Sequence, residues 1–541
     1  MNLRSLFLAT FILTSFQAFG QTFSRADSLR GTLGPLRSCY DVTFYELEVK
    51  LNAKEKRLAG SNTFHFRATR NFNKLQFDLF SNLAIAKILY HGEGLGYGRE
   101  HNAVFVEFPE TIQKGALDSF TVIYGGEPIE AERPPWDGGI VWKEDKYGLP
   151  FLGVACQGMG ASAWWPVKDH LSDEPDSMSV SIIVPDYLMA VSNGNLRSRK
   201  KLAGNFNRWE WFINYPINSY GVSFYVGDYV HFSEPYANGD SKYNLDYYVL
   251  ADNEEVAREH FKQVTPMLKI FEKYFGPYPF PKDGYALVET NYWGMEHQSA
   301  VAYGNEFNNM PEYDFDFIII HESLHEWFGN SLSMKDNADM WIHEAFTTYG
   351  EWVYIEERYD YDKAVQYALG QRRRIVNKIP LVGPRDVNFD NWPAADIYFK
   401  GAWMLHSLRN TVNNDSLWFA TLYDFAVDHR LKFLETEEVI SYFNQKLGAD
   451  YSTHFEQFLF HKDLPVLEMK FSGKGKNAKF HYRWNADVEA FSMPVDAKIK
   501  GDDLRLTPKV DWQHYQAKNL KADDVELGAG NFLYEIKLIE N

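Results

Sequence analysis

The hydrophobic period of the chain changes twice along its 541 residues, and this limits the folds that it can adopt. From about residue 40 to 235 apolar and polar residues alternate with period two, as in "YDVTFYELEVKLN" and "GSNTFHFRAT", which is typical of half-buried strands. After that the apolar spacing becomes helical, as in "NEEVAREHFKQVTPMLKIFEKYFG". Alternation returns after Pro465, in "AKFHYRW" and "NFLYEIKLI".

These changes predict a multidomain α+β protein with three folded parts. We expect an N-terminal β domain over residues 21–235, a mostly helical domain over 236–463 and a small C-terminal β domain over 464–541. A chain of 541 residues is also too long for a single hydrophobic core. Charged residues make up 24% and hydrophobic residues 45%, which excludes wholesale disorder.

The first 20 residues have the pattern of a signal peptide. Arg4 precedes an apolar run at 6–13, and the small residues Ala18 and Gly20 flank Phe19 where cleavage is expected. We therefore expect an exported protein, secreted or periplasmic. The apolar run is too short to span a bilayer, and no later run is long enough, so no membrane span is expected.

Two global features bear on partners and on redox chemistry. The net charge of −18 repels nucleic acid and anionic lipid, and it favours cationic ligands. No nucleic-acid partner is therefore expected. Cys39 and Cys156 are the only cysteines. They could pair in an oxidising compartment, and the sequence leaves this open.

The stretch "HESLHEWFGN", at 321–330, places His321 and His325 one helical turn apart, with Glu322 beside the first. Two imidazoles at this spacing can both reach one zinc ion, and the neighbouring carboxylate can take a proton from a metal-bound water. The alternatives are polar residues at the end of an ordinary helix, by chance, and a structural zinc site, which needs four protein ligands.

A second helical stretch, "NADMWIHEAFTTYGEW", supplies a third ligand. It places Glu344 19 residues after His325, where a short connection between two helices brings the carboxylate to the same metal. Two histidines and one glutamate with an open fourth position form the coordination set of hydrolytic zinc enzymes. The neighbouring His343 is a competing candidate, although it points about 100° away on a helix.

Three further stretches complete a family pattern: "VETNYWGMEHQSAVAYGN", "CQGMGASAWWPVKDHLSDEP" and "IYFKGAWML". With the zinc motif, they make the chain resemble the aminopeptidase N family of zinc aminopeptidases, which includes the leukotriene-hydrolase type. The resemblance covers essentially the whole chain after the signal peptide. It implies a thermolysin-like catalytic domain followed by a β-sandwich-like domain. The chain resembles a short form, without the large C-terminal helical domain of longer members.

The resemblance also implies roles for individual residues. His321, His325 and Glu344 would hold one zinc ion, with Glu322 as general base. In the family signature Gly-Ala-Met-Glu-Asn the chain has Trp293-Gly294-Met295-Glu296-His297, so the signature's Glu and Met are kept and its ends differ.

Three more positions carry implied roles. The resemblance makes Glu296 and Gln157 the partners of the substrate's free ammonium group. It makes Tyr398 a hydrogen-bond donor to the oxyanion of the transition state, as part of the family's Tyr-x-Lys-Gly. Lys400 and Gly401 in that motif are expected to be structural. "PVKDHLSDEP" departs from the family's Pro-Cys-x-Asp-x-Pro, so this loop is expected to differ in shape.

The sequence therefore predicts a zinc aminopeptidase that acts on peptides with a free N-terminus. A zinc endopeptidase and a non-catalytic peptide-binding protein are the alternatives, and epoxide hydrolysis, known in one branch of the family, stays open as a second activity. The endopeptidase would not need Glu296, and the binding protein would have lost a ligand or the base, whereas all are present. The preferred N-terminal side chain and the oligomeric state cannot be deduced.

Overall fold

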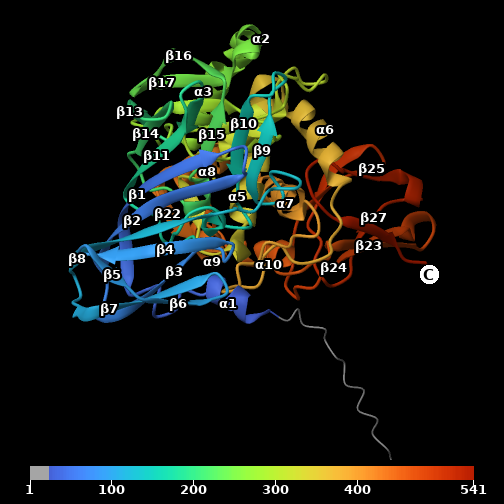
Figure 1. The fold of residues 1–541 in the computed structure, drawn as a ribbon. Coiled ribbons are helices and arrows are strands. Elements are labelled where there is room, and N and C mark those ends of the chain that lie inside the picture. The colour runs from blue at the N-terminus through green and yellow to red at the C-terminus, as the bar shows by residue number, and fades with distance from the viewer. Residues whose placement is uncertain (1–22, 541) are drawn as a thin grey trace, which may run out of the picture.

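The computed structural model describes residues 23–540, and its first part is built from strands (Figure 1). The expected signal peptide lies outside the described residues. After helix α1 (Arg25–Gly31), the strands are β1 (Tyr40–Asn52), β2 (Arg57–Ala68), β3 (Phe72–Asp78), β4 (Leu83–Tyr90), β5 (Glu93–Leu95), β6 (Tyr97–Glu100), β7 (Ala103–Ile112), β8 (Leu117–Gly126), β9 (Gly139–Glu144), β10 (Pro150–Ala155), β11 (Ser177–Pro185), β12 (Met189–Ser192), β13 (Asn195–Leu202), β14 (Phe206–Ile213) and β15 (Phe224–Gly227).

These strands form three sheets around one core. The largest sheet has the order β13-β14-β11-β1-β2-β8-β4-β5, and smaller sheets have the orders β12-β15-β10-β9 and β3-β7-β6. The period-two pattern that predicted β1 corresponds to its burial, since Tyr45, Leu47 and Val49 point into the core and the residues between them do not. Cys39 and Cys156 are buried in this region as free thiols.

A five-stranded sheet joins this β region to the helices. It has the order β16-β17-β18-β20-β19. Its strands are β16 (Tyr229–Asn238), β17 (Ser241–Leu250), β18 (Tyr285–Glu289), β19 (Gly294–Met295) and β20 (Val301–Tyr303). The boundary expected at residue 235 therefore falls inside β16, and the chain changes sheets at Asp228, between β15 and β16. The alternating pattern simply continues through this change, so the sequence alone does not mark it.

The two faces of this sheet belong to different hydrophobic cores. Tyr247 and Leu287 pack with the helices. Tyr248 and Val288, the next residue on each strand, pack with the N-terminal β region. Since successive side chains of a strand point to opposite faces, the sheet is the shared wall between the two cores.

Helices make up most of the region that follows. They are α2 (Glu254–His260), α3 (Val264–Phe275), α4 (Phe317–Leu324), α5 (Trp341–Arg358), α6 (Tyr361–Arg372), α7 (Asp396–Val412), α8 (Asp415–Asp428), α9 (Thr436–Leu447) and α10 (Ser452–Leu459). The short strands β21 (Leu332–Met334) and β22 (Lys432–Leu434) pair in parallel between them. No helix in the described part of the chain is long and apolar enough to cross a membrane.

Helices α4 and α5 carry the sequence motif and follow each other closely. The side chain of Asp316 caps α4 by accepting a hydrogen bond from the amide of Ile318. Helix α4 ends at Leu324, and the chain beyond it forms irregular turns. Gly329 has φ 147°, a backbone conformation outside any helix, which explains why the helical pattern stops before it.

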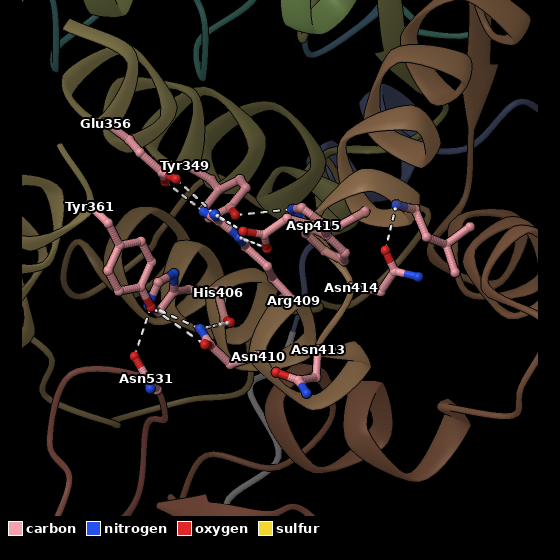
Figure 2. Close-up of polar contacts among 12 residues, drawn as sticks. Tyr349, Glu356, Tyr361, His406, Arg409, Asn410, Asn413, Asn414, Asp415 and Asn531 are labelled. Atoms are coloured by element: carbon pink, nitrogen blue, oxygen red, sulfur yellow. Dashed lines mark hydrogen bonds and ion pairs between the residues drawn. The ribbon is translucent and has the colours of Figure 1, made fainter. Parts of the chain in front are cut away.

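An ion-pair cluster fixes helices α5, α7 and α8 together (Figure 2). The Arg409 guanidinium donates to both carboxylate oxygens of Glu356, at 2.6 and 2.7 Å, and to Asp415 at 2.8 and 3.0 Å. Next to it, the Tyr361 hydroxyl donates to Asn531 at 2.7 Å, which connects the helices with the C-terminal region. The buried arginine makes this junction costly to open.

The C-terminal region consists of short strands in two sheets, ordered β27-β24-β23-β29 and β26-β25-β28. Its strands are β23 (Val466–Ser472), β24 (Lys479–Asn485), β25 (Val495–Ile499), β26 (Asp502–Leu506), β27 (Gln513–Gln516), β28 (Val525–Leu527) and β29 (Glu535–Leu538). Figure 1 shows these strands, in red, beside the orange helices. Phe480 and Trp484 join the same hydrophobic cluster as the helices, so the two regions share a core.

Candidate active site

The residues of the zinc motif converge in the structure. His321 lies in the last turn of α4, His325 follows the end of that helix, and Glu344 lies in the first turn of α5. The two Nε2 atoms are 3.3 Å apart, and Glu344 Oε2 is 3.7 Å from His321 and 3.5 Å from His325. All three residues are buried, and Glu344 Oε2 has no hydrogen-bond partner among the described residues. This donor set fits one zinc ion.

A second overlapping group also meets the geometric condition for a metal, namely Glu296, Glu322 and His325. Glu296 Oε1, however, already accepts hydrogen bonds from Gln157 and Tyr220. The group with two imidazoles and the unpartnered carboxylate oxygen is therefore the better metal site.

The other nitrogen of each imidazole is held by the protein. His321 Nδ1 lies 2.7 Å from Glu351 Oε1, and His325 Nδ1 lies 2.9 Å from the carbonyl oxygen of Phe328. Glu351 in turn accepts from the Tyr367 hydroxyl at 2.8 Å. These contacts turn both Nε2 atoms toward the centre of the site, as the ligands of a metal require. Glu351 was not predicted, although its position two helical turns after Glu344 on α5 could have revealed it.

The electrostatics of the centre favour a cation. Burial by itself would raise the pKa of Glu344, but His325 and His321 hold that pKa well below its usual range. Burial would likewise lower the pKa of His321, but the carboxylates of Glu344 and Glu351 outweigh it and raise the pKa. Carboxylates thus dominate the field around the ligand atoms, which suits a divalent ion.

Glu322 sits beside the ligands and is 8% exposed. Burial, together with the nearby Glu296 carboxylate, raises its pKa to about 7 even though His321 opposes the shift. A carboxyl group with a pKa near neutrality is suited to take up and release protons. A Cβ atom at Gly294 would lie 2.6 Å from Glu322 Oε1, so glycine at this position lets the strand approach the carboxylate.

Glu296 and Gln157 meet at the end of β19, although they are far apart in the chain. Gln157 follows β10 of the N-terminal region, and its Nε2 donates to Glu296 Oε1 at 2.6 Å. The Tyr220 hydroxyl donates to the same oxygen at 3.2 Å. Burial raises the pKa of the Glu296 carboxyl, and the charge of His325 opposes that shift. The structure therefore places a buried, oriented carboxylate next to the metal ligands.

Two histidines whose roles the sequence did not settle lie near Glu296 but outside the cavity. His343 contacts the Tyr220 hydroxyl at 3.5 Å and Ser333 Oγ at 3.4 Å, and it is not part of the metal cluster. His297, which replaces the asparagine of the family signature, has its Nδ1 2.5 Å from the Tyr225 hydroxyl. Both side chains are fully buried and serve the packing around Glu296 rather than the cavity.

Tyr398 lies in the first turn of α7 and faces the metal ligands. Its ring is 6.0 Å from the His321 ring. Burial, and then the charges of Glu344 and Glu296, raise its pKa, so the hydroxyl stays protonated and can donate. Lys400 instead donates to the carbonyl oxygens of His461 and Lys462, beyond α10.

All seven predicted site residues line one cavity of about 1550 Å³. They are Gln157, Glu296, His321, Glu322, His325, Glu344 and Tyr398. The cavity lies between the N-terminal β region, the edge strand β19 and the helices α4 to α7. A buried two-histidine, one-glutamate centre with a neighbouring free carboxylate is the arrangement that hydrolytic zinc enzymes use.

Comparison with known proteins finds a family match over the region that carries the metal motif. Residues 259–458 match the Peptidase family M1 domain. The chain is 25% identical over 265 residues to endoplasmic reticulum aminopeptidase 1 of Mus musculus, covering 45% of this chain and 28% of that protein. It is 23% identical over 408 residues to the Homo sapiens protein of the same name, covering 63% of this chain and 43% of that protein. The chain thus spans less than half the length of these relatives.

Solved structures agree in fold. An M1 zinc metallopeptidase from Deinococcus radiodurans superposes with a TM-score of 0.67 at 21% identity, over 79% of this chain and 94% of that one. A mutant from the same organism, bound to the substrate Tyr-Ser-Ala, gives a TM-score of 0.67 at 20% identity, over 81% and 98%. Residues 259–458 thus match the M1 family model and the fold agrees with solved M1 zinc metallopeptidases, in line with the resemblance seen in the sequence.

Proposed function

We propose that the protein is a zinc-dependent aminopeptidase that releases N-terminal residues from peptides. The observation that carries this proposal is the position of Glu296. Its carboxylate is buried, is oriented by Gln157 and Tyr220, and lines the same cavity as the His321–His325–Glu344 centre. A buried carboxylate at this place can bind an ammonium group strongly, and only a peptide with a free N-terminus offers one there.

The proposed site divides the work between the metal and the side chains. A zinc ion held by His321, His325 and Glu344 would supply Lewis acidity for the scissile carbonyl and for the attacking water. Glu322 takes the proton of that water and then delivers it to the leaving amine, since its pKa of about 7 suits both transfers. The protonated hydroxyl of Tyr398 donates to the oxygen that becomes negative as the carbonyl is attacked.

The amine side of the site determines which bond is cut. Glu296 accepts hydrogen bonds from the ammonium group, and the carbonyl oxygen of the Gln157 amide can accept another. Because these groups are fixed, they set the distance from the N-terminus to the catalytic groups, so that the first peptide bond lies at Glu322. The free energy of binding the ammonium group thereby serves to position the first peptide bond.

Two finer expectations belong to the same proposal. The helices and the five-stranded sheet follow a thermolysin-like plan, and the two C-terminal sheets form a small β sandwich; the sheet orders and shared core support this. The leader pattern of residues 1–20 supports export, to the periplasm or the exterior.

Hydrolysis of aminoacyl-p-nitroanilides, each with and without N-acetylation and before and after chelation of metal, tests the proposal. We expect chelator-sensitive cleavage of the free-amine members alone. Cleavage of acetylated members at comparable rates would show endopeptidase action, for which an ammonium anchor is unnecessary. No cleavage of any substrate by the zinc-loaded protein would show a peptide-binding protein instead.

A further inference from the structure

A row of aromatic rings leads from the metal ligands to the mouth of the cavity. The Phe317 ring stacks on His321, with centroids 5.3 Å apart and planes inclined by 26°. Trp293 lies 5.7 Å from Phe317, and Trp136 lies 6.1 Å from Trp293. We call Phe317, Trp293 and Trp136 the aromatic wall. All three line the cavity that contains the seven site residues.

The outer part of this wall is exposed to solvent. Trp136 is 71% exposed and Trp293 is 44% exposed, the only tryptophans among the large exposed apolar residues of the described chain. Indole rings are costly to leave in water, and neighbouring exposed rings along a cavity usually mark a binding surface. Since the wall begins at a metal ligand, it is continuous with the proposed catalytic site.

The wall is also held in place before any ligand binds. The Trp293 indole N–H donates to Asn305 Oδ1 at 3.1 Å, and Asn305 Nδ2 donates to Asp316 Oδ1 at 2.9 Å. Asp316 is the residue that caps α4, so Trp293 is tied to the helix that carries His321. The loop that carries Trp136 contains an ion pair between Arg133 and Asp137. Such fixed rings lose little entropy on binding.

The path of the substrate brings its second residue to this wall. Strand β19 is the end strand of its sheet, and it pairs only with β20 in the described part of the chain. A peptide whose ammonium group is held by Glu296 can therefore lie along the free edge of β19. Because Trp293 and Gly294 precede Glu296, the peptide runs antiparallel to β19, and the residue after the cleaved bond comes to lie beside Trp293.

We propose that the aromatic wall is the subsite for the second residue of the peptide, and that it selects a large apolar side chain there, preferably an aromatic one. This inference rests on the proposed aminopeptidase function. The side chain would lie against Trp293 and be covered by Trp136, so that rings from the N-terminal region and from the start of β19 enclose it. A glycine at that position would leave both tryptophans in water.

Three tripeptides test the wall: Ala-Phe-Ala, Ala-Gly-Ala and alanyl-cyclohexylalanyl-alanine, whose ring has the size of phenylalanine without its π system. Alanine release gives kcat/KM for the zinc-loaded wild type and for Trp136→Ala. We expect the wild type to prefer Ala-Phe-Ala to Ala-Gly-Ala by about tenfold, and Trp136→Ala to lose about fivefold on Ala-Phe-Ala but less than about twofold on Ala-Gly-Ala. In the wild type, kcat/KM for alanyl-cyclohexylalanyl-alanine should lie between the values for Ala-Phe-Ala and Ala-Gly-Ala.

Tyr147→Ala is the matched control, because Tyr147 is an equally exposed aromatic residue, at 67%, outside the cavity. It should leave all three peptides unchanged. Trp136→Leu, which keeps apolar bulk, should retain part of the preference. Equal losses on Ala-Phe-Ala and Ala-Gly-Ala, or no loss on either, would overturn the proposal. Equal rates for the aromatic and saturated rings would overturn its aromatic part.

Binding calorimetry with the same peptides separates this inference from the proposed function. If the wild type cleaves none of these peptides and no free-amine aminoacyl-p-nitroanilide, the aminopeptidase function is wrong, and the binding data alone then test the aromatic wall. Tighter binding of Ala-Phe-Ala than of Ala-Gly-Ala, lost in Trp136→Ala, would still support the subsite. Equal binding of the two peptides by the wild type would exclude it.

Discussion

The metal side and the amine side of the cavity are built in different ways. His321 and His325 lie in and just after α4, Glu344 lies in α5, and the two helices follow each other in the chain. Gln157 and Glu296 are separated by 139 residues and meet because β10 of the N-terminal region lies against the end of β19. The residues of the first group lie close together in the sequence, whereas those of the second are brought together by the packing of two cores.

Under the proposed function, substitutions on the metal side should affect the hydrolysis of every substrate, and substitutions on the amine side should affect which substrates are cleaved. A substitution on the metal side removes a step that every peptide needs. A substitution on the amine side removes an interaction that only a free N-terminus makes. Substitutions on the two sides can test this division.

Glu322→Gln should lower kcat about 1000-fold or more for every substrate, because the amide cannot take the proton from water. Zinc content should remain one ion per chain, because the ligands are His321, His325 and Glu344. Steady-state kinetics and metal analysis of the purified variant measure both. Loss of zinc together with activity would instead favour the overlapping group Glu296, Glu322 and His325 as the metal site.

Tyr398→Phe should lower kcat by about 100- to 1000-fold with little change in KM, because the hydroxyl acts on charge that develops only in the transition state. The ring contact with His321 at 6.0 Å is kept in this variant, so the fold around the metal should not change. A rise in KM with an unchanged kcat would show that Tyr398 binds the substrate and does not stabilise the oxyanion.

Glu296→Gln should lower kcat/KM about 100-fold for free-amine substrates, since a charge-assisted hydrogen bond to the ammonium is lost. Any slow cleavage of N-acetylated peptides should be unaffected. Glu312→Gln serves as the control, because Glu312 lines the same cavity and is exposed. If free and blocked peptides suffered equally, Glu296 would belong to the chemistry, and the division between the two sides would be wrong.

Gln157→Ala should have a smaller effect, about tenfold on kcat/KM for free-amine substrates, and mainly through KM. The variant removes the bond of 2.6 Å to Glu296 and a neutral acceptor, while the Tyr220 hydroxyl still orients the carboxylate. The measurement is the same pair of free and acetylated peptides. No change in KM would mean that Tyr220 alone orients Glu296.

The same contrast explains what could be predicted from the sequence. Helical spacing placed His321 and His325 one turn apart, because helix geometry is determined over a few residues, whereas Glu344 was added by supposing a short connection between two helices. Gln157 and Tyr398 were placed through resemblance to the family. Neither has a local pattern that distinguishes it from an ordinary loop or helix residue.

Features that depend on tertiary packing were missed. The rings of Trp136 and Trp293 come from segments far apart in the chain, and no periodicity relates them. The change of sheet at Asp228 was not recognised for a similar reason, because the strands on either side of it alternate alike. Glu351 was missed although it lies on a predicted helix, since its role depends on a contact with His321.

The smallest expected effect concerns the seam between the two cores. Asp283 lies just before β18, and its carboxylate accepts hydrogen bonds from the backbone N–H of Asn214 at 3.0 Å and from Asn214 Nδ2 at 2.6 Å. Asn214 follows β14 of the N-terminal region. Burial raises the pKa of Asp283 to about 6, even though these donors oppose the shift. The folded protein therefore keeps a proton at a pH at which the unfolded chain has lost it.

The sign of the effect follows from this proton. Between the ordinary aspartate pKa of 3.8 and the raised pKa of about 6, the folded state binds more protons at Asp283 than the unfolded state, so stability falls as pH rises. Asp283→Asn removes this contribution, about 3 kcal/mol at most. The loss in Tm of the wild type between pH 4 and pH 6.5, relative to that of the variant, measures it. A parallel pH dependence in the two proteins would mean that solvent reaches Asp283, and that the seam is looser than the contacts on either side of it.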